Sequence, residues 1–387
     1  MTCLWGITEK KSAYCAILHK LFTEKRKDID IDQNQKYNTN MKSVTCGGMT
    51  MGKSVTIRDI AKEAGVSAAT VSRFLNRTGY VDEKTGARIA AEVKRFNYRP
   101  SRIAQSLKTK VSKNLMMVVP DIQNPFYSRM ANEMQHLVFA EGYTITLFDS
   151  EGKFESEMKC LALAESIGVD GILFASVAVH QSVLRELGRM NLPVVMINSY
   201  DACPFDSVHG VRNEGTYLSA RHLISLGHRR IGFAGGAVGT AIAASRKAGY
   251  LHAMQEAGLP VEKQLIFEMD FNSDAGRKSG TYFSALQPMP TAICCANDMI
   301  ALGLQQVLLE RGISVPGDIS LTGMDNVRYG SVCSPPLTTV TNDSAAFAKE
   351  AVQALFERIR GTYTGPPREV LIGRELIARG STAPPRE

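Results

Sequence analysis

The segment "VSAATVSRFLN", residues 66–76, combines small and hydroxyl-bearing side chains with a single arginine. The planar guanidinium of Arg73 presents a fork of donors that matches the two acceptors on the major-groove edge of guanine. Ala68 and Ala69 offer only methyl groups, which suit contact with thymine methyls. Two interpretations are open: the segment contacts base edges of DNA, or it is an amphipathic helix whose polar side faces water.

The residues around this segment predict three short helices. Apolar side chains recur at helical spacing over 57–64, and Gly65 can supply a left-handed cap at the end of that helix. Ser67 is a good N-cap for a second helix over about 68–75. Two short helices joined by such a turn form a helix-turn-helix, and a third helix over roughly 83–96 closes a small core. In this motif the second helix lies in the major groove of DNA.

Charge is spread unevenly along the chain. Residues 53–113 hold fourteen Lys and Arg against five Asp and Glu, a net charge of +9, within a chain whose total is +7. A basic segment joined to a slightly acidic body points to an anionic partner for that segment alone. The alternative from charge alone is a solvated basic face.

The stretches "TIRDIAKEAGVSAATVSRFLN" and "YRPSRIAQSL" resemble, closely and in order, the DNA-binding head of the lactose-repressor/galactose-repressor (LacI/GalR) family of transcription regulators. The resemblance implies a head over 53–98 in which Ala68 and Ala69 touch base edges and Arg73 contacts a guanine. The DNA-contacting residues expected in the head are Thr56, Ser67, Ala68, Ala69, Thr70, Ser72, Arg73 and Asn76.

Three of these residues have simpler interpretations as well. Ser67 is first a helix cap and only second a phosphate contact. Thr70 is equally consistent with a surface residue whose hydroxyl bonds back to its own helix. Arg73 is also consistent with a solvated charge.

Residues 99–113 are expected to be a hinge and linker. Pro100 ends the third helix, and the residues that follow can form only about two turns, which are marginal as an isolated helix in water. The family resemblance implies a hinge helix that orders in the minor groove, where Leu107 wedges between base pairs, Ala104 allows close helix pairing and Lys108 enters the groove. The alternative is a plain interdomain linker with a buried leucine.

Residues 1–52 differ from the rest of the chain. They are polar and lack apolar periodicity, which predicts a disordered extension or a misplaced start, with natural translation beginning near Met51. A disordered arm that adds non-specific DNA affinity is the alternative.

The body, residues 114–387, predicts an α/β fold. Apolar runs such as "LMMVVPD", "GVDGILFAS" and "TAICCAND" alternate with helix-length segments, the pattern of parallel sheets covered on both faces. "PDIQNPFYSRM", "ANDMIALG" and "VPGDISLTGMDN" resemble the two-lobed, periplasmic-binding-protein-like core of the same family. The resemblance implies three crossings between lobes, placed near Arg212, Asn326 and Gly361. Lobe one is then 114–211 with 327–361, and lobe two is 212–326 with 362–387.

Ligands of open α/β sheets bind at the carboxyl ends of the strands. The family places contacts with its small-molecule effector at matching strand ends, and flat aromatic rings there suit a sugar ring or a base. The expected effector-binding residues are Phe126, Tyr127, Asn198, Arg212, Arg246, Phe271 and Asp298. The alternatives are core packing for Phe126 and Phe271, and helix capping for Asn297 with Asp298.

Arg212 departs from the family pattern, because the family commonly carries an acid where this chain has "VRN". One hypothesis is an anionic effector, such as a sugar acid or phosphosugar. The other is that Arg212 is neutralised within the protein.

The sequence as a whole favours a dimeric, effector-controlled DNA-binding regulator, a repressor, acting on double-stranded DNA at a pseudo-palindromic operator. "GFAGGAVG" lacks the dinucleotide-binding spacing, no GxSxG elbow occurs, and the histidines show no metal spacing, so no enzyme activity, cofactor or metal is expected. The eight cysteines predict reduced thiols in the cytoplasm, and no apolar run is long enough for a membrane span. A sugar-binding or enzymatic α/β protein without DNA binding is the rival class. The effector, the operator, and induction versus co-repression stay open.

Overall fold

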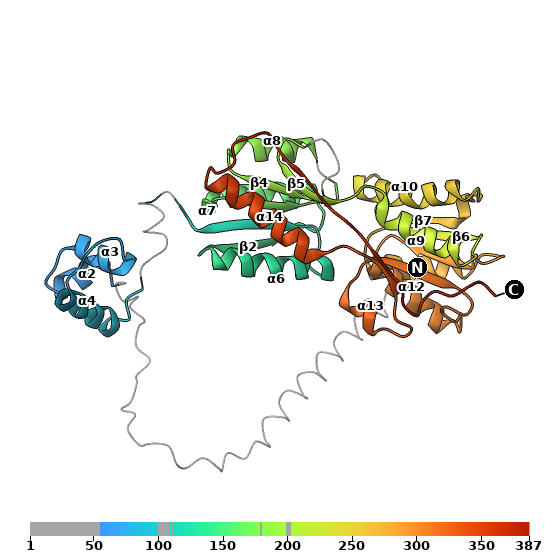
Figure 1. Cartoon of the computed structure of the whole chain (residues 1–387), viewed down its shortest axis with the longest axis horizontal. Helices are drawn as coiled ribbons and strands as arrows, with labels where there is room; N and C mark the ends of the chain where they lie inside the picture. The colour runs from blue at the N-terminus through green and yellow to red at the C-terminus, as the bar shows by residue number, and fades with distance from the viewer. Residues whose placement is uncertain (1–54, 100–108, 110, 179, 199–202, 387) are drawn as a thin grey trace, which may run out of the picture. The chain divides into compact units, whose positions relative to one another are not determined.

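The computed structural model describes residues 55–99, 109, 111–178, 180–198 and 203–386. The predicted extension 1–52 and the hinge residues Ala104, Leu107 and Lys108 lie outside the described residues. The chain divides into two compact units, one that ends at Arg99 and one that begins at Pro100 (Figure 1).

The first unit is a three-helix head made of α2 (Ile57–Glu63), α3 (Ala68–Asn76) and α4 (Glu83–Arg95). One side chain from each helix, Ile60, Val71 and Ile89, is fully buried, and these three form the centre of the small core. The turn between α2 and α3 contains Gly65, whose φ of +64° is the left-handed conformation expected there.

Lobe one of the second unit contains a six-stranded, wholly parallel sheet in the order β11-β5-β4-β3-β1-β2. Its strands are β1 (Asn114–Val119), β2 (Thr144–Asp149), β3 (Ile172–Ala175), β4 (Val194–Ile197), β5 (Asp206–Gly210) and β11 (Glu369–Ile372). Its helices are α6 (Pro125–Ala140), α7 (Phe154–Ile167), α8 (Gln181–Arg189) and α14 (Ser344–Ile359). Alternate residues of β1 enter two separate cores, one with α6 and α14 and the other with α7 and α8, so helices cover both faces as the apolar strands predict.

Lobe two contains a second six-stranded sheet in the order β12-β10-β9-β8-β6-β7, parallel except for β12. Its strands are β6 (Ile231–Gly235), β7 (Ile266–Glu268), β8 (Ala292–Cys295), β9 (Ser320–Asp325), β10 (Thr338–Thr341) and β12 (Leu376–Ile377). The helices are α9 (Glu214–Ser225), α10 (Ala241–Glu256), α11 (Ser273–Phe283), α12 (Asp298–Glu310) and the short α13 (Arg328–Val332), with a 3₁₀ turn η1 (Lys263–Leu265). The adjacent thiols of Cys294 and Cys295 are free and fully buried in β8.

The chain crosses between the lobes three times, and two crossings differ from the expected positions. The first lies between β5 and α9, where Arg212 was expected to mark it. The second follows β10, near residues 342–343 rather than Asn326, because β10 pairs with β9 in the sheet of lobe two. The third lies between β11 and β12, near residues 373–375 rather than Gly361, because β11 pairs with β5 of lobe one.

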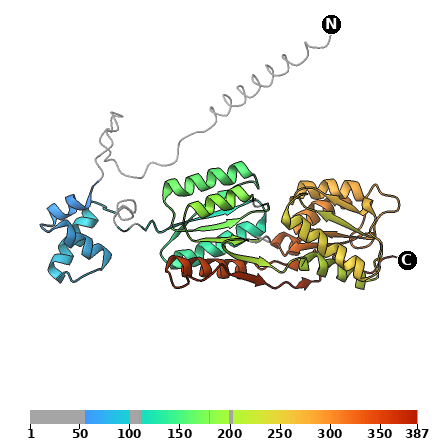
Figure 2. The same ribbon diagram turned by 90° about the horizontal axis from the view of Figure 1, so that it is seen from above.

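The predicted lobe boundaries at Asn326 and Gly361 are therefore wrong. Residues 327–341 belong to lobe two, and residues 362–372 belong to lobe one. Both errors have one cause: the sheet that a strand joins is decided by a partner strand far away in the sequence. Figure 2 shows the C-terminal part of the chain, in red, passing from the lobe of α14 to the other lobe.

The cap of α3 allows a test of the head that is independent of DNA. The Ser67 hydroxyl accepts a hydrogen bond from the Thr70 backbone N–H at 3.1 Å. Replacing Ser67 with Ala removes this bond, and we expect α3 to lose about 1 kcal/mol of stability. Hydrogen exchange of the α3 amides in the full-length protein should then speed up about fivefold.

Ser67→Asp is the matched control, because aspartate is an equally good N-cap. The cap assignment is contradicted if the alanine and aspartate variants exchange at the same rate.

Candidate functional site

The N-terminal end of α3 carries hydroxyl groups that are already engaged within the head. Ser67 Oγ lies 2.9 Å from Thr70 Oγ1 and also accepts from the Thr70 amide, so the predicted capping role of Ser67 is confirmed. Thr56 caps α2: its hydroxyl donates to an Asp59 carboxylate oxygen at 2.7 Å and accepts from the Asp59 amide. Any contact of these three residues with DNA remains a prediction.

The remaining predicted DNA contacts divide by exposure. Ala69, Arg73 and Asn76 are exposed, whereas Ala68 and Ser72 are half-buried, and Ala68 packs against the core of the head. Asn76 donates through Nδ2 to the Ser72 hydroxyl at 3.2 Å. Of the two alanines, Ala69 thus has the methyl group more available to a partner.

Arg73 is supported by a glycine in the turn that follows α3. A Cβ atom added to Gly79 would lie 3.3 Å from Arg73 Cδ, so the aliphatic part of the arginine rests on this bare backbone. The next residue, Tyr80, is 92 % exposed and is not among the DNA contacts predicted from the sequence. An aromatic residue inside the polar turn "RTGYVD" is the signal that was available.

A cavity of about 720 Å³ lies between the lobes, at the carboxyl ends of both sheets. Segments after β1, β2 and β3 line it from lobe one, and segments after β6, β7 and β8 line it from lobe two, together with the last residue of β9. We call it the effector cavity, because the effector-binding residues predicted from the sequence are expected at these strand ends. Of the seven predicted effector-binding residues, it brings together Phe126, Tyr127, Arg246 and Phe271.

Arg246 and Phe271 form a rigid aromatic and cationic surface in this cavity. The Arg246 guanidinium carbon lies 5.1 Å from the centre of the Phe271 ring, within the range of a cation–π contact. Arg246 Nη1 donates to the Ala296 carbonyl at 2.7 Å, and Nη2 lies 3.6 Å from Asp325 Oδ1. The Phe271 ring also packs on Gly236, where an added Cβ atom would lie only 2.0 Å from the ring.

Phe126 and Tyr127 contribute less surface to the cavity than predicted. Their exposed fractions are 4 % and 6 %, and both belong to the core of lobe one. The Phe126 ring meets Phe347 edge to face, with centroids 5.8 Å apart. Most of the surface of both side chains thus packs in the core, as the alternative interpretation of Phe126 predicts. Only a small part of each side chain faces the cavity.

Asp298 does not line the effector cavity. Its side chain is fully buried, Oδ1 accepts from the Thr339 hydroxyl at 2.6 Å, and Oδ2 accepts from the Val327 amide at 2.8 Å. The helix cap of α12 is Asn297, whose Oδ1 accepts from the Ile300 amide. Burial, together with the nearby charge of Asp325, raises the pKa of Asp298 to about 8.

Asn198 and Arg212 also lie outside the lining of the effector cavity. Asn198 is 4 % exposed, while Arg212 is exposed in the first crossing. Arg212 therefore supplies no positive charge to the lining of this cavity.

Sequence reasoning missed Asp325, which lines the effector cavity at the end of β9. Asp325 has a φ of +110°, is 7 % exposed, and accepts from Asn342 Nδ2 at 3.2 Å. It ends the apolar run "ISLTGMDN", so the strand-end rule that selected Asp298 would have found it too.

The charged lining of the effector cavity is predominantly acidic. Its carboxylates are Asp121, Asp149, Glu151, Asp270, Asp274 and Asp325, against the two bases Lys153 and Arg246. Both bases are paired with acids of the same lining, Lys153 with Glu151 and Arg246 with Asp325. Little positive potential is therefore left for an anion.

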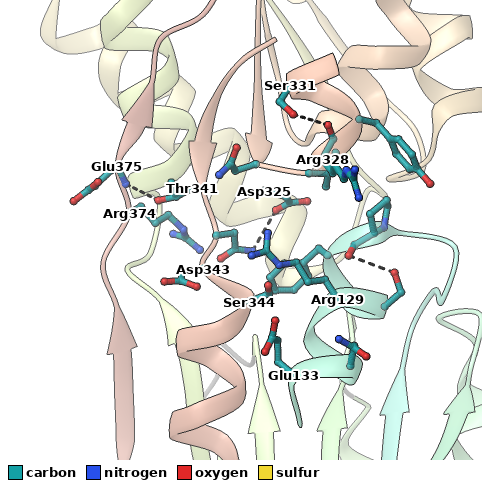
Figure 3. Close-up of a pocket in the computed structure, with 18 of the residues that line it drawn as sticks. Arg129, Glu133, Asp325, Arg328, Ser331, Thr341, Asp343, Ser344, Arg374 and Glu375 are labelled. Carbon is teal, nitrogen blue, oxygen red and sulfur yellow. Dashed lines mark hydrogen bonds between the residues drawn. The ribbon is translucent and has the colours of Figure 1, made fainter. Parts of the chain in front are cut away.

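A second cavity, of about 1460 Å³, is lined by α6, α13 and the second and third crossings. Figure 3 shows Arg129 and Glu133 on its lobe-one side, with Asp325 and Arg328 on its lobe-two side. Phe126 and Asp325 line both cavities, so the two spaces share part of one wall.

Within the described ranges, no group of three or more His, Cys, Asp or Glu residues is placed to hold a metal ion. No helix among the described residues is long and apolar enough to cross a membrane.

Two family models match the chain. "Bacterial regulatory proteins, lacI family" matches residues 56–101, and "Periplasmic binding protein-like domain" matches residues 220–382. The HTH-type transcriptional repressor PurR of Actinobacillus pleuropneumoniae serotype 3 (strain JL03) is 33 % identical over 328 residues, 84 % of this chain and 98 % of that protein. The chain belongs to the LacI family. PurR of Aliivibrio salmonicida (strain LFI1238) is similarly related to this LacI-family protein, with 34 % identity over 310 residues, 80 % of this chain and 93 % of that one.

Solved structures agree with this assignment. The lac repressor dimer bound to operator and the anti-inducer ONPF superposes with a TM-score of 0.77 at 25 % identity, covering 86 % of this chain and 100 % of that one. A LacI family transcriptional regulator from Enterococcus faecium with bound ribose gives a TM-score of 0.65 at 25 % identity, covering 70 % and 100 %. The predicted fold class, a helix-turn-helix head with a two-lobed α/β core, is confirmed. So is the predicted function at the level of the family, an effector-controlled DNA-binding transcription regulator.

The buried carboxyl of Asp298 predicts a pH dependence of stability in the LacI-family protein. The pKa of Asp298 in the folded protein lies above the ordinary value of 3.8. Its contribution to the free energy of unfolding is therefore full below about pH 4 and is lost as the pH rises through about 8. Asp298→Asn removes this titration, and we expect stability to fall less steeply from pH 5 to 8, by up to about 1.4 kcal/mol per pH unit. Urea unfolding at several pH values measures the slope.

Asp318→Asn is the control, because the pKa of Asp318 is lowered and its titration lies below this window. Equal slopes for Asp298→Asn and the wild type between pH 5 and 8 would show that Asp298 is ionised throughout.

Proposed function

We propose that this LacI-family protein is a homodimeric repressor that binds a pseudo-palindromic DNA operator, with its affinity set by a small sugar-like effector in the cavity between the lobes. The observation that carries the proposal is the Arg246–Phe271 surface at the carboxyl ends of two sheets, in a chain that also carries a helix-turn-helix head. The relatives are named transcriptional repressors, which supports action by DNA binding without catalysis or a cofactor. The proposed location is the cytoplasm, where bacterial DNA lies.

The mechanism follows from linkage between two binding events. An effector that touches both lobes binds one relative orientation of the lobes more tightly than others and shifts the population toward it. The same shift changes the spacing of two hinge segments in a dimer and hence operator affinity, reciprocally for both ligands. The predicted roles of Ala104, Leu107 and Lys108 in the minor groove belong to this proposal.

The proposed base contacts are Arg73 with guanine and Ala69 with thymine methyl groups. Arg73 is exposed on α3 and is supported by Gly79, which favours a defined side-chain direction. Thr56, Ser67, Thr70, Ser72 and Asn76 are proposed to position the head on phosphates or nearby edges. To these we add Tyr80, whose exposed ring follows the turn that supports Arg73 and suits packing on the sugar–phosphate backbone.

The proposed effector is neutral and rich in hydroxyl groups. Carboxylates accept hydrogen bonds from hydroxyls, and the flat Phe271 ring suits one face of a sugar ring. The hypothesis of an anionic effector depends on Arg212, which lies outside the cavity lining. The acidic residues of the lining favour a neutral ligand instead.

Arg73 is expected to carry sequence specificity. Arg73→Ala should weaken binding to an operator selected from random DNA by about 1–3 kcal/mol, because a bidentate guanine contact is lost. Binding to non-specific DNA should weaken far less, since that depends on phosphate charge. Gel shifts of the full-length protein at fixed salt compare the two.

Lys94→Ala removes the same charge from the exposed end of α4 and serves as the control. Equal losses for operator and random DNA in Arg73→Ala would contradict the base contact. Failure of the wild-type protein to bind DNA even at low salt would sink the proposed function itself.

Ligand charge is testable with matched pairs of sugars. We expect calorimetry to show tighter binding of a neutral sugar than of its acidic counterpart, for example glucose over glucuronic acid or ribose over ribose 5-phosphate, by about tenfold or more. Asp270→Asn removes an exposed carboxylate of the lining and should narrow that gap. Tight binding confined to the acidic sugars would refute the neutral effector.

A further inference from the structure

Arg374 lies in the third crossing, between β11 and β12, and it contacts the first crossing. Its Nη1 donates to the Val211 carbonyl at 2.5 Å, and the residue is 9 % exposed. The guanidinium occupies the space beside Gly210: an added Cβ atom would lie 2.1 Å from Nη2 and 2.2 Å from Cζ. Only a residue without a side chain leaves room for the arginine there.

The contact extends a pairing that begins within the sheet of lobe one. β11 runs parallel to β5, with Ile372 opposite Gly210, and Arg374 continues that association beyond the last strand residues. It does so at the point where the segments after β5 and β11 leave lobe one.

The next residue ties the third crossing to the second. The Glu375 amide donates to the Thr341 hydroxyl at 2.8 Å, and the Thr341 amide donates to the Glu375 carbonyl at 2.7 Å. Two consecutive residues of the third crossing thus contact the chain at the other two: Arg374 bonds to Val211 in the first crossing, and Glu375 bonds to Thr341, the last residue of β10 directly before the second crossing.

Reorientation of the lobes requires backbone rotations within these three crossings, because they are the covalent connections between the lobes in the described part of the core. Crossings that are bonded to one another cannot rotate independently. Arg374 also lines the second cavity, which shares Phe126 and Asp325 with the effector cavity, so it lies beside the space that such a reorientation must alter.

We propose that Arg374, seated on Gly210 and bonded to Val211, is a positioning residue that makes the crossings move as one hinge and so restricts the lobes to discrete relative orientations. The proposal rests on the proposed function in one respect: effector control of DNA binding requires such discrete orientations. Arg374 is not among the residues that line the effector cavity.

The first test is thermal unfolding of full-length single and double variants. Gly210→Ala should lower the melting temperature, because its methyl group collides with the guanidinium. Arg374→Ala added to Gly210→Ala should restore part of that loss by removing the clash. Gly373→Ala is the matched control, since an added Cβ atom there meets nothing within 4 Å.

The second test measures the hinge itself. Spin labels on unnatural amino acids at Lys349 of α14 and Lys278 of α11, both exposed, report the distance between lobes in the ligand-free protein. We expect Arg374→Ala and the double variant to show a new distance population above about a tenth of the molecules. Arg374→Lys keeps a donor for the Val211 carbonyl and should match the wild type, as should Gly373→Ala.

The outcomes separate the two claims. A wild-type distance distribution in folded Arg374→Ala, or in the double variant if Arg374→Ala does not fold, overturns the positioning role. So does an Arg374→Lys distribution as broad as that of the alanine variant. Lack of operator binding by the wild-type protein overturns the proposed function instead, and the distance measurement needs neither DNA nor effector.

Discussion

The architecture of the core depends on the pairing of two late strands, β11 with β5 and β12 with β10. β11 joins the sheet of lobe one after the chain has passed through lobe two, and β12 joins the sheet of lobe two after the chain has passed through lobe one. Neither lobe is therefore a continuous segment of the sequence. The three resulting connections lie at the carboxyl ends of the strands. Backbone amides and side chains there are not all paired within the sheets and can bind a ligand. The effector cavity is a direct product of that topology, because both sheets turn their strand ends toward the same gap.

The junction between the lobes holds two buried carboxyl groups, which an apolar interior tolerates only when hydrogen-bond partners or protonation compensate their burial. Asp298 and Asp325 are both buried, and burial raises the pKa of each. Asp298 is held by the Thr339 hydroxyl and the Val327 amide, while Asp325 is held by Asn342 and faces Arg246. Because an unpaired carboxylate in such a place costs several kcal/mol, these partners constrain where β9, α12 and α13 can lie.

Local signals were sufficient for the head and for the class of the core. Apolar spacing, the Ser67 cap and Gly65 locate α2 and α3 within a residue or two, and continuous apolar runs identify buried parallel strands. The position of the crossings carries no local signal, since "PPLTTV" looks the same whichever sheet it joins. The strand-end rule applies equally to Asp298 and Asp325, and only tertiary packing decides which carboxyl is covered by Thr339 and which one reaches the cavity.

The contact between Gly236 and Phe271 has a consequence for how ligand preference could change in related proteins. The ring rests on bare backbone, so any side chain at position 236 would have to push it toward the cavity or tilt it. For the proposed effector site, a residue behind the wall of the cavity thus limits the size of ligand that fits, without contacting the ligand itself. A single substitution at position 236 would then change which ligands fit, although this residue would not appear among the ligand contacts.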